Sequence, residues 1–115
     1  MLAAHLDSSE LVRETFSSAS GALGYDMRRL VLEDPDSRLD RTEFTQPALL
    51  TASIALLRLW RRRHGGEAGH VAGHSLGEYS ALVAAGSLDF IDAVRLVAFR
   101  GRVMSEAVKE GEGRM

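Results

Sequence analysis

Apolar residues recur every three or four positions along most of this chain, which is the spacing of one face of an α-helix. The first such run covers residues 8–22, and Asp7 or Ser8 is placed to cap its start. Its apolar face holds Leu11, Val12, Thr15, Phe16 and Ala19. A shorter run predicts a second helix over residues 26–33, and the sequence Asp34–Ser37 that follows is typical of a turn.

The third apolar run is the longest. Thr45 is placed to cap it, Pro47 lies in its first turn, and apolar positions continue to Trp60. One stripe holds Leu49, Ala52, Leu56 and Leu59, and it is widened by Leu50, Ile54 and Leu57. The pattern therefore predicts a helix that is buried over much of its circumference. The basic run Arg61–His64 is typical of a solvent-facing helix end, where cations complement the helix dipole.

The next segment has a different pattern. Residues 69–73, Gly-His-Val-Ala-Gly, predict one short β-strand, and a helical pattern follows at once from Ser75 to Ala85. A last helix is expected from about Asp89 to Lys109. A strand followed by a helix is the order of a parallel sheet, which needs several strands. Because only one strand is found, either further strands lie in segments that read as helices or the chain is part of a larger α/β domain, and we favour the second interpretation.

Composition and charge narrow the functional classes. The 115 residues are 45% hydrophobic and 26% charged, which is typical of one globular domain at most. The net charge is -2, so no basic excess favours nucleic-acid binding. The absence of cysteine excludes disulfides, cysteine-ligated zinc and thiol nucleophiles. No apolar run approaches the length of a membrane span and no signal-peptide pattern is present, so we expect a cytoplasmic protein without membrane contact.

The candidate chemistry lies in residues 73–77, Gly-His-Ser-Leu-Gly, which match the G-x-S-x-G pattern of a nucleophile elbow. In an elbow the serine occupies a tight strand-to-helix turn, and the flanking glycines leave room for that turn. We therefore expect Ser75 to be a catalytic nucleophile. The Leu76 backbone N–H, at a helix N-terminus, is expected to donate to an oxyanion. The other interpretation is a small-residue turn that packs a helix close to a strand.

A serine nucleophile needs a base, and none of the four histidines has a good claim to that role. His74 is next to Ser75, so at a sharp turn its side chain is expected to point away and to support the elbow. His5 and His64 lie near helix ends, and His70 begins the predicted strand. We therefore expect the base to lie outside this sequence.

Arg100 is the second residue with candidate chemistry. On the same predicted helix, Arg95 has Asp92 and Arg102 has Glu106 about one turn away, so both arginines are expected to form ordinary pairs. At the same offsets from Arg100 the sequence has Leu96, Val97, Val103 and Met104. A cation on an apolar face requires an anion. That anion is a carboxylate elsewhere in the fold or a substrate, and the pattern alone does not decide between them.

Three separated motifs resemble the malonyl-CoA:acyl-carrier-protein transacylase family, the stand-alone acyltransferases of type II fatty acid synthesis. They are residues 45–50 (Thr-Gln-Pro-Ala-Leu-Leu), residues 73–82 (Gly-His-Ser-Leu-Gly-Glu-Tyr-Ser-Ala-Leu), and residues 92–97 followed by Arg100-Gly101. The resemblance implies an α/β-hydrolase-like acyltransferase domain with a parallel sheet. Residues 1–115 would then be the N-terminal portion of its large subdomain without the first strand, mostly helical and with one strand leading into the elbow.

The resemblance also implies a role for each matching residue. Ser75 would take the malonyl group from malonyl-CoA, with the Leu76 N–H as one oxyanion donor. Arg100 would pair with the free malonyl carboxylate, because a planar guanidinium binds a carboxylate bidentately. Gln46 and His74 would support the site. The malonyl group would then pass to the phosphopantetheine thiol of an acyl carrier protein, with no metal and no cofactor beyond the coenzyme A thioester.

Two features of the family are absent from this sequence. Family members begin with a strand and a Gly-Gln-Gly-Ser-Gln loop, whose glutamine completes the oxyanion hole, and their catalytic histidine lies well downstream. We therefore expect an incomplete piece of the enzyme, with little or no turnover of its own.

Three other interpretations stay open. An acyltransferase domain of a polyketide synthase would share the fold and the Ser–Arg pair, although residues 79–82 favour the stand-alone form. An α/β-hydrolase esterase would hydrolyse neutral esters and would be indifferent to Arg100. A non-catalytic fragment would bind only a partner or itself, and it would not be acylated.

Overall fold

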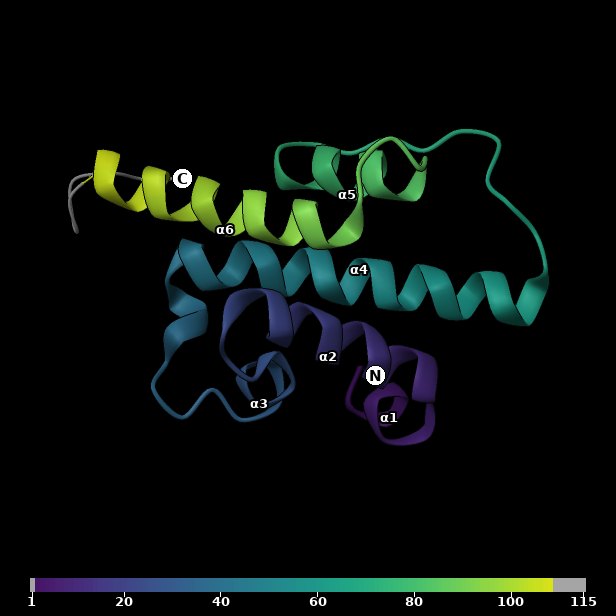
Figure 1. The fold of residues 1–115 in the computed structure, drawn as a ribbon, viewed down its shortest axis with the longest axis horizontal. Helices are drawn as coiled ribbons and strands as arrows, with labels where there is room; N and C mark the ends of the chain where they lie inside the picture. Colours follow the sequence, from purple (N-terminus) through teal and green to yellow (C-terminus); the bar gives the residue numbers. More distant parts are fainter. Residues whose placement is uncertain (1, 109–115) are drawn as a thin grey trace.

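The computed structural model describes residues 2–108, which form six α-helices and one 3₁₀ helix, η1. In chain order they are α1 (Leu2–Ser8), α2 (Glu10–Leu23), α3 (Met27–Leu32), η1 (Arg38–Asp40), α4 (Thr42–His64), α5 (Leu76–Ala84) and α6 (Phe90–Ala107). Figure 1 shows α4 across the middle of the molecule, with α5 and α6 on one side and α1, α2 and α3 on the other.

Helix α4 is the central element, because it packs against α2, α5, α6 and η1. Its buried residues are Gln46, Pro47, Ala48, Leu50, Thr51, Ile54, Ala55 and Leu59. The members Ala48, Leu50, Ile54, Ala55 and Leu59 belong to one hydrophobic core with buried residues of α2 and α6. The predicted broad burial of this helix is confirmed, but Leu49 is 54% exposed and Trp60 is 44% exposed, since no described helix covers that side.

Side-chain caps fix the starts of three helices. Ser9, Asp26 and Asp89 accept hydrogen bonds from backbone N–H groups in the first turns of α2, α3 and α6. A cap of this kind contributes about 1 kcal/mol. The predicted helix starts at Asp26 and near Asp89 are confirmed. The cap of α2 is Ser9 rather than Asp7 or Ser8, because the preceding residues form α1, which the apolar pattern did not predict.

Two helix ends also differ from the sequence prediction. Helix α4 begins at Thr42, and the hydroxyl of Thr45 donates to the Arg41 carbonyl within the first turn instead of capping the helix. Helix α6 ends at Ala107, and Lys109 lies outside the described residues. None of the helices in residues 2–108 has the length and apolar character that crossing a bilayer requires.

The predicted β-strand at residues 69–73 is wrong for this structure. These residues are exposed and lie in the connection between α4 and α5, and no strand is present within residues 2–108. Figure 1 shows this connection leaving the end of α4 and running back alongside α5. A strand requires a neighbour to pair with its N–H and C=O groups, and the backbone of residues 66–73 makes no backbone hydrogen bond in the described part of the chain. The described part of the chain is therefore helical, which confirms the expected mostly helical character but not the one expected strand.

Helices α4 and α6 meet in direct backbone contact at Gly101. A Cβ atom on this residue would lie 2.6 Å from the Cα of Glu43 and 2.6 Å from the carbonyl oxygen of Thr42. Only glycine therefore allows the first turn of α4 to rest on α6. Because Arg100 precedes Gly101, the same contact brings the Arg100 side chain to the start of α4.

Tyr25 lies in the turn between α2 and α3, with its hydroxyl buried. Its ring meets Phe44 edge-on, with the ring centroids 5.4 Å apart. No group in the described part of the chain forms a hydrogen bond with the hydroxyl. Burial raises the pKa of Tyr25 to about 12, and the Glu43 carboxylate adds to the rise, because both disfavour the phenolate.

We expect Gly101→Ala to lower the free energy of unfolding by about 1–3 kcal/mol, because the added Cβ meets backbone atoms that cannot turn aside. Gly21→Ala is the matched control. Gly21 lies inside α2, and its Cβ would meet nothing within 4 Å, so helix propensity predicts a gain of about 0.5–1 kcal/mol. Urea unfolding followed by circular dichroism compares the variants, and equal stability of the two would contradict the tight crossing.

We expect Tyr25→Phe to be at least as stable as the parent chain below pH 10, because it removes a buried hydroxyl without a described partner. Between pH 10 and about 12 the unfolded parent chain releases the phenol proton, while the folded chain retains it. The free energy of unfolding of the parent therefore falls through this window, and that of the variant falls less. Urea unfolding at a series of pH values measures both, and parallel curves would refute the burial argument.

Candidate active site

Ser75 lies in the turn that leads into α5, and its backbone is strained. Its φ is 57° and its ψ is -118°; a non-glycine residue in such a conformation costs about 1–3 kcal/mol. The Gly77 N–H donates to the His74 carbonyl over 2.9 Å, and the Glu78 N–H donates to the Ser75 carbonyl over 3.1 Å. These two hydrogen bonds hold the turn, and the Ser75 side chain is exposed.

The two glycines that flank Ser75 have different roles in this structure. A Cβ on Gly73 would lie 1.9 Å from the carbonyl oxygen of Gly77, so no other residue fits there. A Cβ on Gly77 would meet nothing within 4 Å. Gly73 is therefore the glycine that lets the incoming chain pass against the first turn of α5.

Arg100, on α6, reaches two residues that are distant in sequence. Its Nη1 donates to Oε1 of Gln46 over 2.7 Å, and its Nη2 donates to Oγ of Ser75 over 3.2 Å. The ion pairs among the described residues all involve other arginines. The guanidinium of Arg100 is half-buried and contacts only neutral groups in this part of the chain. Its charge is therefore available to an anion beside the Ser75 hydroxyl.

Gln46 connects this arginine to the first turns of α4. The side chain is only 5% exposed. Its Nε2 donates to the Thr42 hydroxyl over 2.8 Å and lies 3.4 Å from Sδ of Met104. The Thr42 hydroxyl and the Met104 sulfur both lie beside the amide nitrogen of Gln46, so its amide oxygen faces Arg100. Gln46 therefore contacts Arg100 directly and reaches Ser75 only through it.

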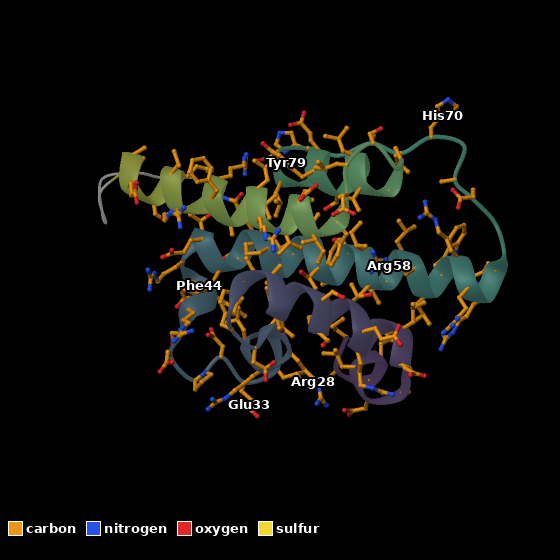
Figure 2. All side chains as sticks on the ribbon, viewed as in Figure 1. Arg28, Glu33, Phe44, Arg58, His70 and Tyr79 are labelled. Carbon is orange, nitrogen blue, oxygen red and sulfur yellow. The ribbon has the colours of Figure 1, made fainter. Side chains whose placement is uncertain are left out.

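Sequence reasoning missed the contact between Tyr79 and Arg100. Tyr79 lies one helical turn after Ser75 on α5, and the Cζ of Arg100 is 5.4 Å from its ring centroid. Figure 2 labels Tyr79 at the first turns of α5, next to α6. The spacing of Tyr79 from Ser75 places both residues on one face of a helix. This spacing is the sequence signal that could have placed Tyr79 at the site.

The two arginines on either side of Arg100 do not form their predicted pairs. Neither Arg95 with Asp92 nor Arg102 with Glu106 is an ion pair in the described structure. The guanidinium of Arg102 instead lies over the ring of Phe99, at 5.5 Å from its centroid. These side chains are exposed, and ion pairs in water gain little free energy.

The remaining candidate groups lie around the same turn. Among the described residues, the Leu76 N–H makes no backbone hydrogen bond, so the N-terminus of α5 presents a free donor beside Ser75. The side chain of His74 is exposed, and this residue supports the turn through its backbone carbonyl. A hydroxyl, a free N–H and an unneutralised cation therefore lie together at the start of α5.

None of the described histidines is hydrogen-bonded to the Ser75 hydroxyl, whose one partner there is Arg100. The ring of His64 lies next to that of Trp60 at the far end of α4, tilted by 36° and with the ring centroids 5.6 Å apart. His70 lies in the exposed connection, where Figure 2 shows it at the edge of the molecule. His5 belongs to α1 on the other side of α4. Within residues 2–108, no cluster of His, Cys, Asp or Glu is arranged to hold a metal ion.

The chain is similar to known proteins over its whole length. The acyl transferase domain family matches residues 4–115. The malonyl CoA-acyl carrier protein transacylase of Escherichia coli (strain K12) is 56% identical over 115 residues, which cover all of this chain and 37% of that protein. The transacylase structure from Coxiella burnetii is 54% identical with a TM-score of 0.90, over 94% of this chain and 34% of that one.

A second solved structure has the same degree of likeness. It is a complex of a type II polyketide synthase acyl-carrier protein with its malonyl-transacylase, matched at 51% identity and a TM-score of 0.90 over 96% of this chain and 36% of that one. The chain thus spans little more than a third of each relative. The family match extends over nearly all of the sequence, and the helices follow the same path. The chain therefore belongs to the acyl transferase domain family.

Proposed function

We propose that residues 1–115 form part of the large subdomain of an α/β acyltransferase domain, and that the whole enzyme transfers malonyl groups. The donor is malonyl-CoA, and the acceptor is the phosphopantetheine thiol of an acyl carrier protein in fatty acid biosynthesis. The observation that carries this proposal is the hydrogen bond of 3.2 Å from Nη2 of Arg100 to Oγ of Ser75. It brings an unneutralised guanidinium to an exposed serine hydroxyl, which suits an acyl group that carries a carboxylate.

In the proposed reaction Ser75 is the nucleophile. Its Oγ attacks the thioester carbonyl of malonyl-CoA and loses its proton to a base, and the C–S bond breaks to release coenzyme A as its thiol. The Leu76 N–H donates to the oxyanion of the tetrahedral intermediate. The thiol of the carrier protein then attacks the malonyl ester, and Ser75 recovers its proton. This chemistry calls for no metal or redox cofactor, and we assign it to the cytoplasm, where both substrates are dissolved.

Arg100 supplies selectivity in this scheme. A malonyl ester on Ser75 carries a free carboxylate, which replaces the serine hydroxyl as the partner of the guanidinium. An acetyl ester has no such group and leaves the cation without an anion. Gln46 holds Arg100 from the buried side, and His74 holds the turn through its carbonyl. Both are supporting residues.

The described residues supply neither a base for Ser75 nor a second oxyanion donor. Removal of a base from a serine nucleophile costs several orders of magnitude in rate. We therefore expect this chain to be acylated slowly and to show little or no turnover. A carrier protein of polyketide synthesis is the second candidate acceptor, because the matched transacylase in the carrier complex is 51% identical to this chain. Assays with both classes of carrier protein distinguish the two.

We expect incubation with malonyl-CoA to add one malonyl group to the chain, as measured by intact-protein mass spectrometry. Acetyl-CoA should give no comparable adduct, and Ser75→Ala should abolish the malonyl adduct because Oγ is its attachment point. A malonyl adduct that persists in Ser75→Ala would contradict the assignment of the nucleophile. If neither this chain nor a chain extended by its in-frame flanking sequence is labelled, malonyl transfer is the wrong function.

We expect Arg100→Ala to slow malonyl labelling of Ser75 about 10- to 100-fold, which corresponds to the loss of a charge-assisted hydrogen bond worth about 1.5–3 kcal/mol. Labelling by acetyl-CoA should not fall, because acetyl lacks the carboxylate. Arg102→Ala is the matched control, since Arg102 is an exposed arginine on the same helix. Rates from timed mass spectra test this, and equal losses with both thioesters would indicate a general structural effect instead.

A further inference from the structure

The guanidinium of Arg100 is contacted on three sides. Gln46 accepts a hydrogen bond from Nη1 at 2.7 Å, and Ser75 accepts one from Nη2 at 3.2 Å. The ring of Tyr79 lies 5.4 Å from Cζ, within the range of a cation–π contact. One of these contacts therefore comes from α5, one from the turn that precedes it, and one from α4.

The Tyr79 ring has a fixed position from which it can hold the guanidinium of Arg100. It is partly buried and packs against the hydrophobic core, so its position is fixed by α5 and its neighbours. Its hydroxyl takes no part in the hydrogen bonds that join Arg100, Gln46 and Ser75. The ring, and not the hydroxyl, is therefore the part of Tyr79 that acts on Arg100.

We infer that Tyr79 is a positioning residue that determines the acyl selectivity of this site by holding the guanidinium of Arg100 beside Ser75. This inference rests on the proposed role of Arg100 in binding a carboxylate. A long arginine side chain with one fixed partner retains much rotational freedom, and a carboxylate then has to order it on binding. With the ring in place, the Nη2 atom that faces Ser75 is already aligned for the carboxylate of an ester on that residue.

The ring acts on the bound acyl group and not on the reactivity of the serine. Without it, the Ser75 turn keeps its own backbone hydrogen bonds and the Leu76 N–H keeps its position at the start of α5. Loss of the ring therefore lowers labelling by malonyl-CoA and leaves labelling by acetyl-CoA unchanged. A general loss of structure would lower both.

The test uses the full chain with three substitutions: Tyr79→Leu, which removes the ring, Tyr79→Phe, which removes only the hydroxyl, and Leu82→Ala as control. Leu82 is a 45% exposed residue on the same helix. The first measurement is the NMR shift of the Arg100 Hε in protein labelled with ¹⁵N-arginine, because the ring current of Tyr79 displaces this signal. The second is the ratio of malonyl to acetyl labelling by mass spectrometry.

Tyr79→Leu is expected to abolish the ring-current displacement and to lower the malonyl-to-acetyl ratio about fivefold, the factor expected for a half-exposed cation–π contact. Tyr79→Phe and Leu82→Ala are expected to keep both. An unchanged Arg100 signal in Tyr79→Leu, or an equal loss in Tyr79→Phe, would overturn the inference. If neither the parent chain nor the chain extended by its in-frame flanking sequence forms a malonyl adduct, the proposed function fails, and the Arg100 signal alone still decides whether Tyr79 holds the guanidinium.

Discussion

The hydrogen bond between Gln46 and Arg100 depends on how closely α4 and α6 approach each other. Gln46 is almost fully buried, so both ends of its amide need partners within the protein. Thr42 satisfies the nitrogen end, and Arg100 satisfies the oxygen end. Gly101 permits this spacing because a side chain there would collide with the backbone of α4. One helix contact thus satisfies a buried amide and also brings a cation to Ser75.

Within residues 2–108, the strained turn at Ser75 forms without a sheet beside it. Helix α5 packs against both α4 and α6, and its first turn is closed by hydrogen bonds within residues 74–78. Gly73 lets the preceding chain pass close to that turn. Helix packing therefore supplies the stabilisation that opposes the strain, and the groups of the candidate site keep their positions in this helical part of the family's domain.

Local pattern predicted most helices, because helical periodicity and caps depend on neighbouring residues. It failed at residues 69–73, because a strand exists only when another strand pairs with it, and at Leu49, which is exposed because no described helix covers it. Ser75 and Arg100 were each found from a local signal. Their proximity, and the contact with Tyr79, depend on how α5 and α6 pack on α4, which no single segment of the sequence encodes.

The sequence separation of Gln46 and Arg100 has a consequence for the order of folding. The two residues are 54 positions apart, so their hydrogen bond closes a long loop. The loop-closure entropy for this length is about 3.5 kcal/mol by the (3/2)RT ln n relation, and it opposes the contact until the core has formed. During synthesis Gln46 emerges long before Arg100. We therefore expect the Arg100 end of the candidate site to assemble late, after α4 has packed on α2.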